Sequence, residues 1–343
     1  MKIDFSEYEL FPFSLLSSKT SSGARKGALL RIQFDSDRVG YSDCHPWPEL
    51  GDLPLSAQLN ELREERLTPL TQRSLEHARV DAEARRVNQS LFVTNRLRKQ
   101  PFHLKNHSLI SNLLSLDETK IREKAQAGYS HLKIKVGISP HLEAVCLRKL
   151  EPCLSDFNLK VRLDFNSSLT ERDFDSFLSD LGSCRRRINF IEDPVPFDGK
   201  VWKSLQEKWE IPLALDRTEN MELEFVEPQA FSFLIHKPAI QDPHWIVSCS
   251  QKLKVPVVVT SYLDHPLGQM CAAWVATEVL PQAGAFAVEE TCGVLSHSSY
   301  RPHAFSEEIQ CEGPYLKLPL GTGFGFDRLL AGKNWRSLKD LEV

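Results

Sequence analysis

Short apolar runs recur at a nearly regular interval along the last two thirds of the chain. Most are separated from the next by a stretch that can hold one helix, such as residues 117–128 and 171–182. Strand-like runs that alternate with helical stretches predict βαβ units and a parallel sheet. The runs occupy residues 107–111, 131–136, 160–165, 188–193, 212–216, 232–237, 256–260 and 285–290.

The spacing of these runs predicts how the sheet is arranged. One polar residue lies near the end of each of the last seven runs, and the successive steps between them are 29, 28, 24, 21, 23 and 29 residues. A doubly wound open sheet has the same local pattern, but about eight units favour closure into a β/α barrel, which needs roughly 200 to 250 residues. The seven polar residues are Lys135, Asp164, Glu192, Asp216, Lys237, Thr260 and Glu289.

The first hundred residues have a different pattern. Residues 8–16, 27–35 and 38–48 are predicted strands, with a loop at 17–27, and residues 55–98 are predicted helix. An antiparallel sheet followed by helices predicts an α+β domain. The predicted boundaries are 1–104 for this domain, 105–311 for the barrel with the active site, and 312–343 for a C-terminal segment that packs back on the first domain.

The composition is typical of a soluble globular protein and argues against several classes of partner. Hydrophobic residues make up 41% of the 343 residues and charged residues 26%, and the net charge of −4 predicts no basic surface for nucleic acid. No apolar run approaches the ~18 residues needed to span a bilayer, and the N-terminus lacks the apolar core of a signal peptide. The eight cysteines lack a C-x-x-C pair, which favours reduced thiols in the cytoplasm.

Charged side chains lie at the predicted ends of five consecutive barrel strands. Lys133 and Lys135 share one face of their strand because they are two residues apart, and the same holds for Asp164 and Asn166. The C-terminal ends of barrel strands meet around one cavity, where active sites lie. The other three strands contribute Glu192, Asp216 and Lys237.

The three carboxylates in this set predict a metal site. Burying them without compensation is costly. Mg²⁺ compensates them, because it prefers oxygen ligands, takes few carboxylates and leaves positions open for substrate oxygens; Mn²⁺ is an alternative. We interpret Glu192 as the middle ligand, on the strand between those of Asp164 and Asp216.

The lysines predict acid–base chemistry beside that metal. A nearby dication and a desolvated cavity both lower the pKa of a lysine, which makes a neutral amine available near physiological pH. A substrate carboxylate on the metal makes its α-proton acidic enough to remove. Lysines on both sides of the substrate suit proton removal from either face, or one base with an opposing cation.

Taken singly, each of these residues has a structural explanation. Lys133 and Lys135 could belong to an exposed edge strand, Asp164 and Asp216 could cap helices, and Lys237 could lie on the surface. Their joint occurrence, in order and at barrel spacing, favours a site.

Three further features are interpreted as structural. His236 should face away from Lys237, because neighbouring residues on a strand point to opposite faces. Asp264 and His265 are adjacent, so a loop turn is favoured over a catalytic dyad. The closely spaced glycines of residues 321–327 lack the strand-then-helix context of a dinucleotide site.

At these residues the sequence resembles the enolase superfamily, in particular its muconate-lactonizing-enzyme subgroup; use of a lysine or histidine base with Mg²⁺ is a known property of this superfamily. The resemblance extends from the N-terminal sheet through the whole barrel. It implies an α/β fold with a modified (β/α)8-type barrel, of the (β/α)7β form, and an N-terminal α+β capping domain. The motifs are KIK at 133–135, DFN at 164–166, EDPVP at 192–196, ALD at 214–216 and HKP at 236–238.

The resemblance also implies roles for the residues of the site. Asp164, Glu192 and Asp216 would bind Mg²⁺, and Lys135 and Lys237 would flank a small-molecule carboxylate substrate.

Further residues would act around this group. Lys133 would support Lys135, and Asn166 would lie close to the metal shell. Arg162 shares a strand face with Asp164, so it is a candidate for holding a ligand carboxylate or pairing with the acids.

Within the subgroup, the sequence is most similar to the o-succinylbenzoate synthase family. The likeness rests on the short chain, the strand VRLDFN at 161–166, and the segment TSYLDHPLG at 260–268. This segment implies that Ser261 lies beside the substrate or next to the metal ligands. That family carries out a syn-dehydration of 2-succinyl-6-hydroxy-2,4-cyclohexadiene-1-carboxylate in menaquinone biosynthesis. The resemblance implies that Lys135 removes the α-proton and then protonates the departing hydroxyl, while Lys237 stays charged and faces the ring.

A different activity within the subgroup stays open. Dipeptide epimerases of the subgroup carry an Asp-x-Asp pair after the eighth strand, whereas residues 288–294 here read VEETCGV. N-succinylamino acid racemase, dipeptide epimerase or cycloisomerase activity would use two flanking lysines equally well. Outside the subgroup, the same residues could belong to a barrel that binds without catalysis or to an unrelated metal-dependent barrel. The sequence gives neither the oligomeric state nor the residues that select the substrate.

Overall fold

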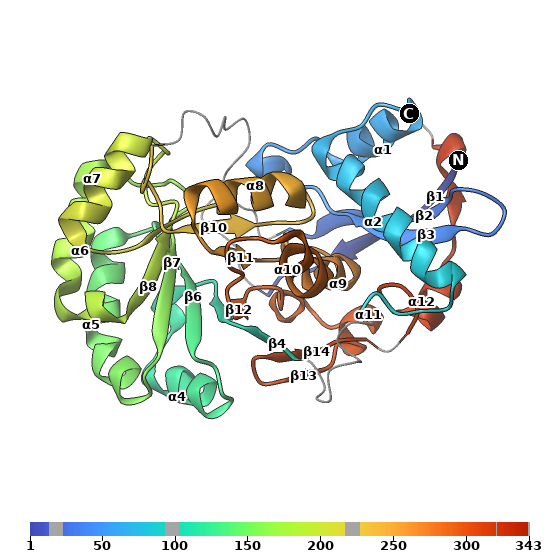
Figure 1. The fold of residues 1–343 in the computed structure, drawn as a ribbon. Helices are drawn as coiled ribbons and strands as arrows, with labels where there is room; N and C mark the ends of the chain where they lie inside the picture. Colours follow the sequence, from blue (N-terminus) through green and yellow to red (C-terminus); the bar gives the residue numbers. More distant parts are fainter. Residues whose placement is uncertain (14–22, 93–102, 217–226, 320, 342–343) are drawn as a thin grey trace.

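An antiparallel sheet forms the N-terminal part of the molecule. The computed structural model describes residues 1–13, 23–92, 103–216, 227–319 and 321–341. In this part of the chain the sheet has the strand order β15-β1-β2-β3, and β1 pairs with β2 along its full length. Figure 1 shows the sheet and α2 on one side of the molecule, with α5, α6 and α7 on the other. The strands are β1 (Lys2–Leu10), β2 (Arg25–Gln33), β3 (Val39–Cys44) and β15 (Arg336–Ser337).

The first strand begins earlier than the sequence predicted. The predicted strand at 8–16 is correct only for residues 8–10, because β1 ends at Leu10 and Pro12 makes only an isolated bridge with Tyr300. A proline has no N–H to donate to a neighbouring strand, so the ladder ends before it. Residues 14–16, and 17–22 of the predicted loop, lie outside the described part, whereas β2 already begins within the predicted loop, at Arg25.

Two helices replace the single helix predicted for residues 55–98. They are separated at Glu65, which has a left-handed φ of 59°. Thr68 then starts the second helix with a capping box, and Pro69 occupies its first turn. Residues 93–98 lie outside the described part. The helices are α1 (Leu55–Arg63) and α2 (Pro69–Arg86).

A parallel sheet of seven strands forms the barrel wall, in the order β11-β10-β9-β8-β7-β6-β5 within the described residues. Each of these strands pairs with the next along the chain, as the predicted alternation of strands and helices requires. The predicted α/β barrel class is confirmed. The strands are β5 (Ser108–Ile110), β6 (His131–Lys135), β7 (Lys160–Asp164), β8 (Ile188–Glu192), β9 (Leu213–Leu215), β10 (Phe233–His236) and β11 (Val257–Val259).

The eighth strand is much shorter than predicted. Residues 285–290 do not form the expected strand; Val288 makes a single bridge to Val257, and Gly293 makes another to Thr260. Between these bridges lies β12 (Thr291–Cys292), which pairs in parallel with β4 (His103–Asn106). Because β4 leads directly into β5, this pairing closes the barrel.

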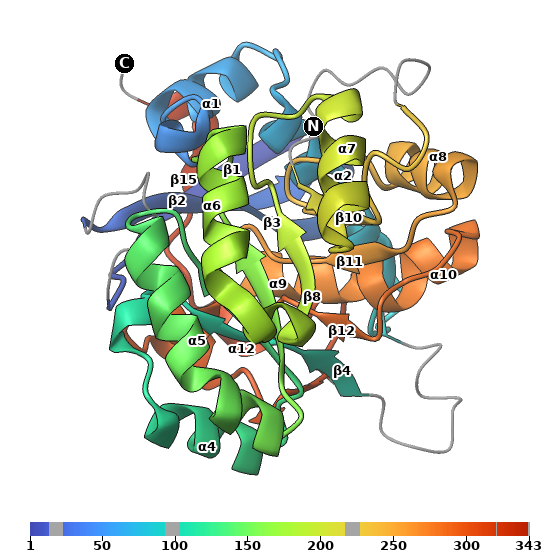
Figure 2. The ribbon, with the colours of Figure 1, turned by 90° about the vertical axis from the view of Figure 1, so that its left-hand side faces the viewer.

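Helices cover the outer surface of the barrel, and Figure 2 shows α5, α6 and α7 side by side there. Side chains that favour helix starts cap several of them, including Thr170 at α6 and Asp198 at α7. Within the described residues, no helix has both the length and the apolar character needed to cross a membrane. These helices are α4 (Glu118–Gln126), α5 (Pro140–Asp156), α6 (Glu171–Leu181), α7 (Gly199–Trp209), α8 (Pro243–Leu253), α9 (Pro266–Trp274) and α10 (Leu280–Ala283).

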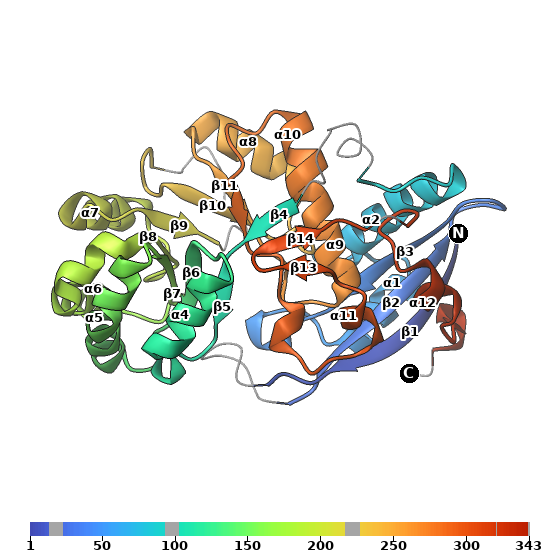
Figure 3. The ribbon, with the colours of Figure 1, turned by 90° about the horizontal axis from the view of Figure 1, so that it is seen from below.

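The C-terminal residues contact both parts of the molecule. β14 pairs with β4 at the barrel, whereas β15 pairs with β1 in the N-terminal sheet. Figure 3 shows β13, β14 and α11 between these two parts. The domain boundaries at 104 and 311 stay a prediction. The remaining elements are α11 (Ala304–Glu307), α12 (Asp327–Ala331), β13 (Cys311–Glu312) and β14 (Tyr315–Lys317).

The barrel interior is layered along the strands. Lys135, Asp164 and Glu192 are register partners on β6, β7 and β8, and they form part of the upper layer. Beneath this layer lies a small apolar cluster, so charged side chains concentrate at the C-terminal ends of the strands, as barrel geometry predicts. The cluster contains Phe190, Ala214, Ile235 and Val258.

Candidate active site

Two lysines of β6 meet two carboxylates of the neighbouring strands. Lys133 Nζ lies 2.7 and 2.6 Å from the two carboxylate oxygens of Glu192 and 3.0 Å from Asp164 Oδ2. Lys135 Nζ lies 2.5 Å from the same Asp164 oxygen. Strand pairing places these residues together, because Lys135 is the register partner of Asp164, which in turn faces Glu192.

A second ion pair lies on the other side of the barrel mouth. Lys237 follows β10 and binds Asp216 Oδ2, and Asp216 follows β9. Asp164, Glu192 and Asp216 are 2%, 1% and 6% exposed, so water screens these charges weakly. The structure therefore brings together all six predicted lysines and carboxylates at the ends of neighbouring strands.

The charges of this group shift one another's pKa values. Burial raises the pKa of Glu192 to about 7, and Asp164 adds to this effect. For Asp164 burial acts in the same direction, but Lys133 and Lys135 outweigh it and lower the pKa. Burial disfavours the charged form of Lys133, yet Asp164 and Glu192 raise its pKa. A lowered lysine pKa beside a dication stays a prediction, because these shifts arise from the protein's own charges.

The oxygen atoms at the strand ends have the chemistry that a hard dication requires. Asp216 Oδ1 is buried and has no hydrogen-bond partner in the described part of the chain. The same part holds no group of three or more His, Cys, Asp or Glu side chains already arranged around a metal position, because each carboxylate is turned toward a lysine. The residues fit a dication in type and burial, and the ligand set stays a prediction.

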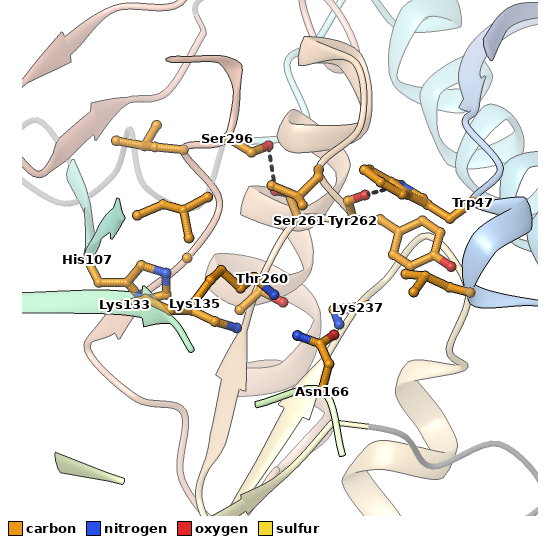
Figure 4. A pocket seen from close by; sticks show the side chains of 15 residues that line it. Trp47, His107, Lys133, Lys135, Asn166, Lys237, Thr260, Ser261, Tyr262 and Ser296 are labelled. Carbon is orange, nitrogen blue, oxygen red and sulfur yellow. Dashed lines mark hydrogen bonds between the residues drawn. The ribbon is translucent and has the colours of Figure 1, made fainter. Parts of the chain in front are cut away.

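A pocket opens directly above these charges. Lys133, Lys135 and Lys237 line it together with Asn166. Figure 4 shows Lys133 and Lys135 reaching the pocket from one side and Lys237 with Asn166 from the other, with Ser261, Tyr262, Ser296 and Trp47 above them. The remaining wall is largely apolar, and it comprises Leu50, Leu109, Leu263, Leu295, Gly293, His107 and Thr260.

Comparisons with known proteins identify the family. The family model described as "O-succinylbenzoate synthase, N-terminal domain" matches residues 3–84. An o-succinylbenzoate synthase from Bdellovibrio bacteriovorus is 33% identical over 340 residues, which cover 99% of each chain. The chain belongs to the o-succinylbenzoate synthase family. The predicted resemblance is confirmed, and family membership makes the protein a lyase of the dehydratase type.

Solved structures show the same fold at low sequence identity. The muconate lactonizing enzyme of Pseudomonas fluorescens has a TM-score of 0.73 at 14% identity, covering 94% of this chain and 95% of its own. The L-Ala-D/L-Glu epimerase of Bacillus subtilis has a TM-score of 0.72 at 16% identity, with coverages of 95% and 98%. A dipeptide epimerase of Enterococcus faecalis, complexed with Mg and L-Leu-L-Tyr, has a TM-score of 0.73 at 17% identity, with coverages of 94% and 98%. The predicted fold, a modified β/α barrel with an N-terminal capping domain, is thus confirmed.

Two residues to which the sequence analysis gave no role in the site hold the ends of the strands. Asp193 has a left-handed φ of 43°, which turns its side chain back so that Oδ1 accepts a hydrogen bond from Asp216 N at 3.1 Å. Gln241 Nε2 donates to Asp216 O at 3.0 Å, and Gln241 Oε1 accepts from Lys237 N at 2.6 Å. The motif EDP could have indicated a role for Asp193, whereas no motif in the sequence indicated one for Gln241.

Asn166 and Ser261 line the pocket, as the family resemblance suggested for substrate or metal-shell positions. Asn166 Nδ2 donates to Asp164 Oδ1 at 2.8 Å, so it orients that carboxylate. Ser261 Oγ lies 2.8 Å from Ser296 Oγ. Ser296, which the sequence did not indicate, therefore belongs to the same wall of the pocket.

Arg162 lies one layer below the pocket and is fully buried. Its Nε donates to Asn189 Oδ1 at 2.8 Å, and its guanidinium lies 4.8 Å from the ring centre of Phe190. Glu289 is the carboxylate nearest to it, at 3.7 Å. Burial lowers the pKa of Arg162 to about 10. The two roles proposed from its sequence position, holding a ligand carboxylate or pairing with the acids, both stay predictions.

His236, Asp264 and His265, which the sequence analysis interpreted as structural, make contacts within the fold. His236 is buried, and its Nδ1 lies 3.2 Å from Gln241 Oε1. Asp264 and His265 form no dyad in the described structure, because His265 Nδ1 accepts a hydrogen bond from Leu267 N at the start of α9. Asp264 instead packs against Gly268, beside Asp43.

Proposed function

We propose that the protein catalyses the Mg²⁺-dependent syn-dehydration of 2-succinyl-6-hydroxy-2,4-cyclohexadiene-1-carboxylate to o-succinylbenzoate, a step of menaquinone biosynthesis. The observation that carries the proposal is the meeting of Lys135 and Lys237, from opposite sides of the barrel mouth, in one pocket of a family member. Such a pair places amines on both sides of a bound carboxylate, which is the requirement for removing a proton next to it.

Asp164, Glu192 and Asp216 would hold the metal in this proposal. Their burial and the unpartnered Asp216 Oδ1 support the assignment, as does the Mg complexed by the dipeptide epimerase of similar fold. A bound dication supplies positive charge that neutralises these carboxylates and makes a proton beside a substrate carboxylate more acidic. Mn²⁺ offers the same ligand preference and is an alternative.

Lys135 acts as the base. It takes the proton from the carbon beside the carboxylate, and its ammonium then gives that proton to the departing hydroxyl on the same face. One C–H bond and one C–O bond break, one C=C bond forms, and water leaves. Formation of the aromatic ring drives the reaction forward.

Lys237 and Lys133 remain cationic during these steps. Lys237 lies on the side of the pocket opposite to Lys135, where its charge stabilises the developing negative charge of the ring system. Lys133 is held by both oxygens of Glu192 and by Asp164, so it positions carboxylates rather than exchanging protons. The three lysines thereby have distinct roles.

A racemase or epimerase activity is the second candidate. The observation in its favour is again the pair Lys135 and Lys237, because two bases on opposite sides of an α-carbon can exchange its proton from either face. The epimerases of similar fold act on dipeptides, but their identity to this chain is too low to transfer their substrates. We further infer a small-molecule substrate and a cytoplasmic setting, which the eight unpaired cysteines support.

The experiment follows the ultraviolet absorbance of the cyclohexadiene substrate with purified protein and Mg²⁺. We expect rapid loss of the diene signal, abolished by EDTA and by Lys135→Ala, and unchanged by Lys149→Ala at an exposed position of α5. No loss above the uncatalysed rate would overturn the synthase proposal. In that case α-deuterium exchange of N-succinylamino acids and dipeptides tests the second candidate.

A further inference from the structure

His107 stands between the pocket and the buried Arg162. It follows β4 and is 6% exposed, and its ring is part of the pocket wall. Its backbone N donates to Cys292 O at 2.9 Å, which ties it to the strand that closes the barrel. Figure 4 shows it beside Lys133 and Lys135. No step of the proposed reaction yet uses this side chain.

The hydrogen bond to Arg162 determines which ring nitrogen carries the proton. Arg162 NH1 lies 3.2 Å from His107 Nδ1. A guanidinium has only donors, so Nδ1 must accept and the single proton of the neutral imidazole must sit on Nε2. An imidazolium would direct an Nδ1–H at the guanidinium, so the geometry also keeps the ring neutral.

Arg162 cannot easily turn away from this contact. NH1 also donates to Thr291 O at 2.8 Å, while Nε is bound to Asn189 and the guanidinium stacks over Phe190. These contacts come from the closing strand β12 and from β8. The orientation of the imidazole is therefore built into the barrel interior.

The other edge of the ring faces Gly293, which also lines the pocket. A Cβ at Gly293 would lie 2.4 Å from His107 Cε1 and 2.6 Å from Nε2, so only glycine leaves room for this edge. In the described part of the chain, Nε2 has no hydrogen-bond partner of its own, although Nδ1 does. A neutral N–H donor is thus available at the pocket.

We propose that His107 donates its Nε2–H to an acceptor oxygen, carboxylate or carbonyl, of the bound substrate, and that Arg162 is the positioning residue that sets this tautomer. The proposal rests on the proposed function for the identity of the substrate. It adds a neutral donor beside the cations Lys133 and Lys135, which favours an acceptor oxygen at a defined place without adding charge.

The tautomer can be measured directly. Imidazole ¹⁵N chemical shifts of the histidine-labelled protein, assigned with His107→Asn, should show an unprotonated Nδ1 and a protonated Nε2. Arg162→Met should shift this pattern toward a mixture of tautomers. An Nδ1-protonated ring or an imidazolium in the wild-type protein would overturn the proposal, whatever the protein catalyses.

Two substitutions then test the Nδ1 edge and the Nε2 edge of the ring separately. His107→Gln places an amide near the Nε2 position and keeps a donor toward the pocket, whereas His107→Asn places it near Nδ1, within reach of Arg162. We expect kcat/KM to fall roughly tenfold to a hundredfold for His107→Asn, the effect of losing one hydrogen bond to a charged group, and to fall much less for His107→Gln. Equal losses in both variants would contradict the donor role.

The affinity for o-succinylbenzoate with Mg²⁺, measured by titration calorimetry, gives a readout independent of turnover. An affinity that is highest in the wild type, lower in His107→Gln and lowest in His107→Asn supports the proposal. Affinities that cannot be distinguished among the three proteins overturn it. Failure of the proposed function is recognised separately, because the wild-type protein would then leave the diene signal unchanged while the ¹⁵N shifts and the affinities still report on His107.

Discussion

Lys133 binds both carboxylate oxygens of Glu192, at 2.6 and 2.7 Å, in a part of the barrel from which water is almost excluded. This bidentate contact explains why a strand in the barrel wall can end on an acid. Glu192 is surrounded by Asp164 and Asp216, and burial with Asp164 raises its pKa to about 7. The cation of Lys133 is therefore the main partner that keeps Glu192 available as a carboxylate.

The first prediction concerns removal of this cation by Lys133→Met. A buried carboxylate that loses its partner is strongly unfavourable, so we expect the free energy of unfolding of the metal-free protein to fall by about 3 to 5 kcal/mol. Urea unfolding in EDTA measures it. The matched control is Lys203→Met, which removes a half-exposed pair with Glu227 at 3.5 Å and should cost less than about 1 kcal/mol. Similar effects in both variants would contradict this role of Lys133.

Much of the site could be predicted from the sequence, because parallel strands with helical crossovers bring their C-terminal ends to one edge. Once the runs ending at Lys135, Asp164 and Glu192 were recognised as neighbouring strands, their side chains had to meet. The same argument covers Asp216 and Lys237, which follow the next two strands. The periodicity of the sequence is enough to predict that these side chains meet, so no knowledge of tertiary contacts was needed.

The parts that could not be predicted depend on tertiary contacts. The eighth strand was placed too early, because its pairing comes from bridges at Val288 and Gly293 rather than from an apolar run. Gln241 holds two strand ends through side-chain hydrogen bonds, and His107 gains its orientation from Arg162. A glutamine or histidine in a loop gives no signal of such contacts.

The second prediction concerns Gln241→Ala. This change removes the hydrogen bonds to Asp216 O and Lys237 N, so the two residues that directly follow β9 and β10 lose a common support. Each hydrogen bond contributes about 1 kcal/mol, and small displacements of reacting groups lower rates further. We expect kcat to fall at least about tenfold, measured by the diene assay.

A surface glutamine provides the control for this change. Gln251 Nε2 donates to Gly284 O at 2.7 Å at an exposed position, so Gln251→Ala removes a similar bond far from the lysines. Its kcat should match the wild type. If Gln241→Ala also retained full kcat, the support of the strand ends by Gln241 would be unnecessary for the reaction.

The third prediction concerns Gly293→Ala. The added Cβ would lie 2.4 Å from His107 Cε1, which forces the imidazole to move. We expect lower kcat/KM with a smaller effect on unfolding, measured by the diene assay and by urea. In Gly332→Ala the nearest atom to the new Cβ is the Arg328 carbonyl oxygen at 3.5 Å, so this variant should keep wild-type activity. Full activity in Gly293→Ala would show that the exact place of His107 is unimportant.

The fourth prediction concerns two buried carboxyl groups between the N-terminal sheet and α9. Both pack against Gly268, where a Cβ would lie 2.5 Å from Asp264 Oδ2 and 2.9 Å from Asp43 Oδ2. Burial raises the pKa of Asp43 to about 7. Burial, with Asp43 beside it, raises the pKa of Asp264 well above its usual range.

These raised pKa values predict the sign of a pH effect. Between the ordinary pKa near 4 and the raised value, the folded state binds more protons than the unfolded state, so the free energy of unfolding falls as the pH rises. Asp264→Asn resembles the protonated acid and removes one such group. We expect the free energy of unfolding of the variant to exceed that of the wild type by more at pH 8 than at pH 5, because ionisation of Asp264 favours the unfolded state of the wild type over this range.

Urea unfolding at the two pH values measures the difference, and Asp175→Asn provides a control of opposite sign. Burial is the largest single influence on Asp175 and acts to raise its pKa, but the hydrogen bonds from Lys208 and Trp209 together with the charge of Lys208 outweigh it and lower the pKa. Its carboxylate therefore favours the folded state above its ordinary pKa, so Asp175→Asn should be neutral or weakly destabilising at both pH values. A gain for Asp264→Asn that is equal at pH 5 and pH 8 would show that the pKa of Asp264 is not raised in the folded state.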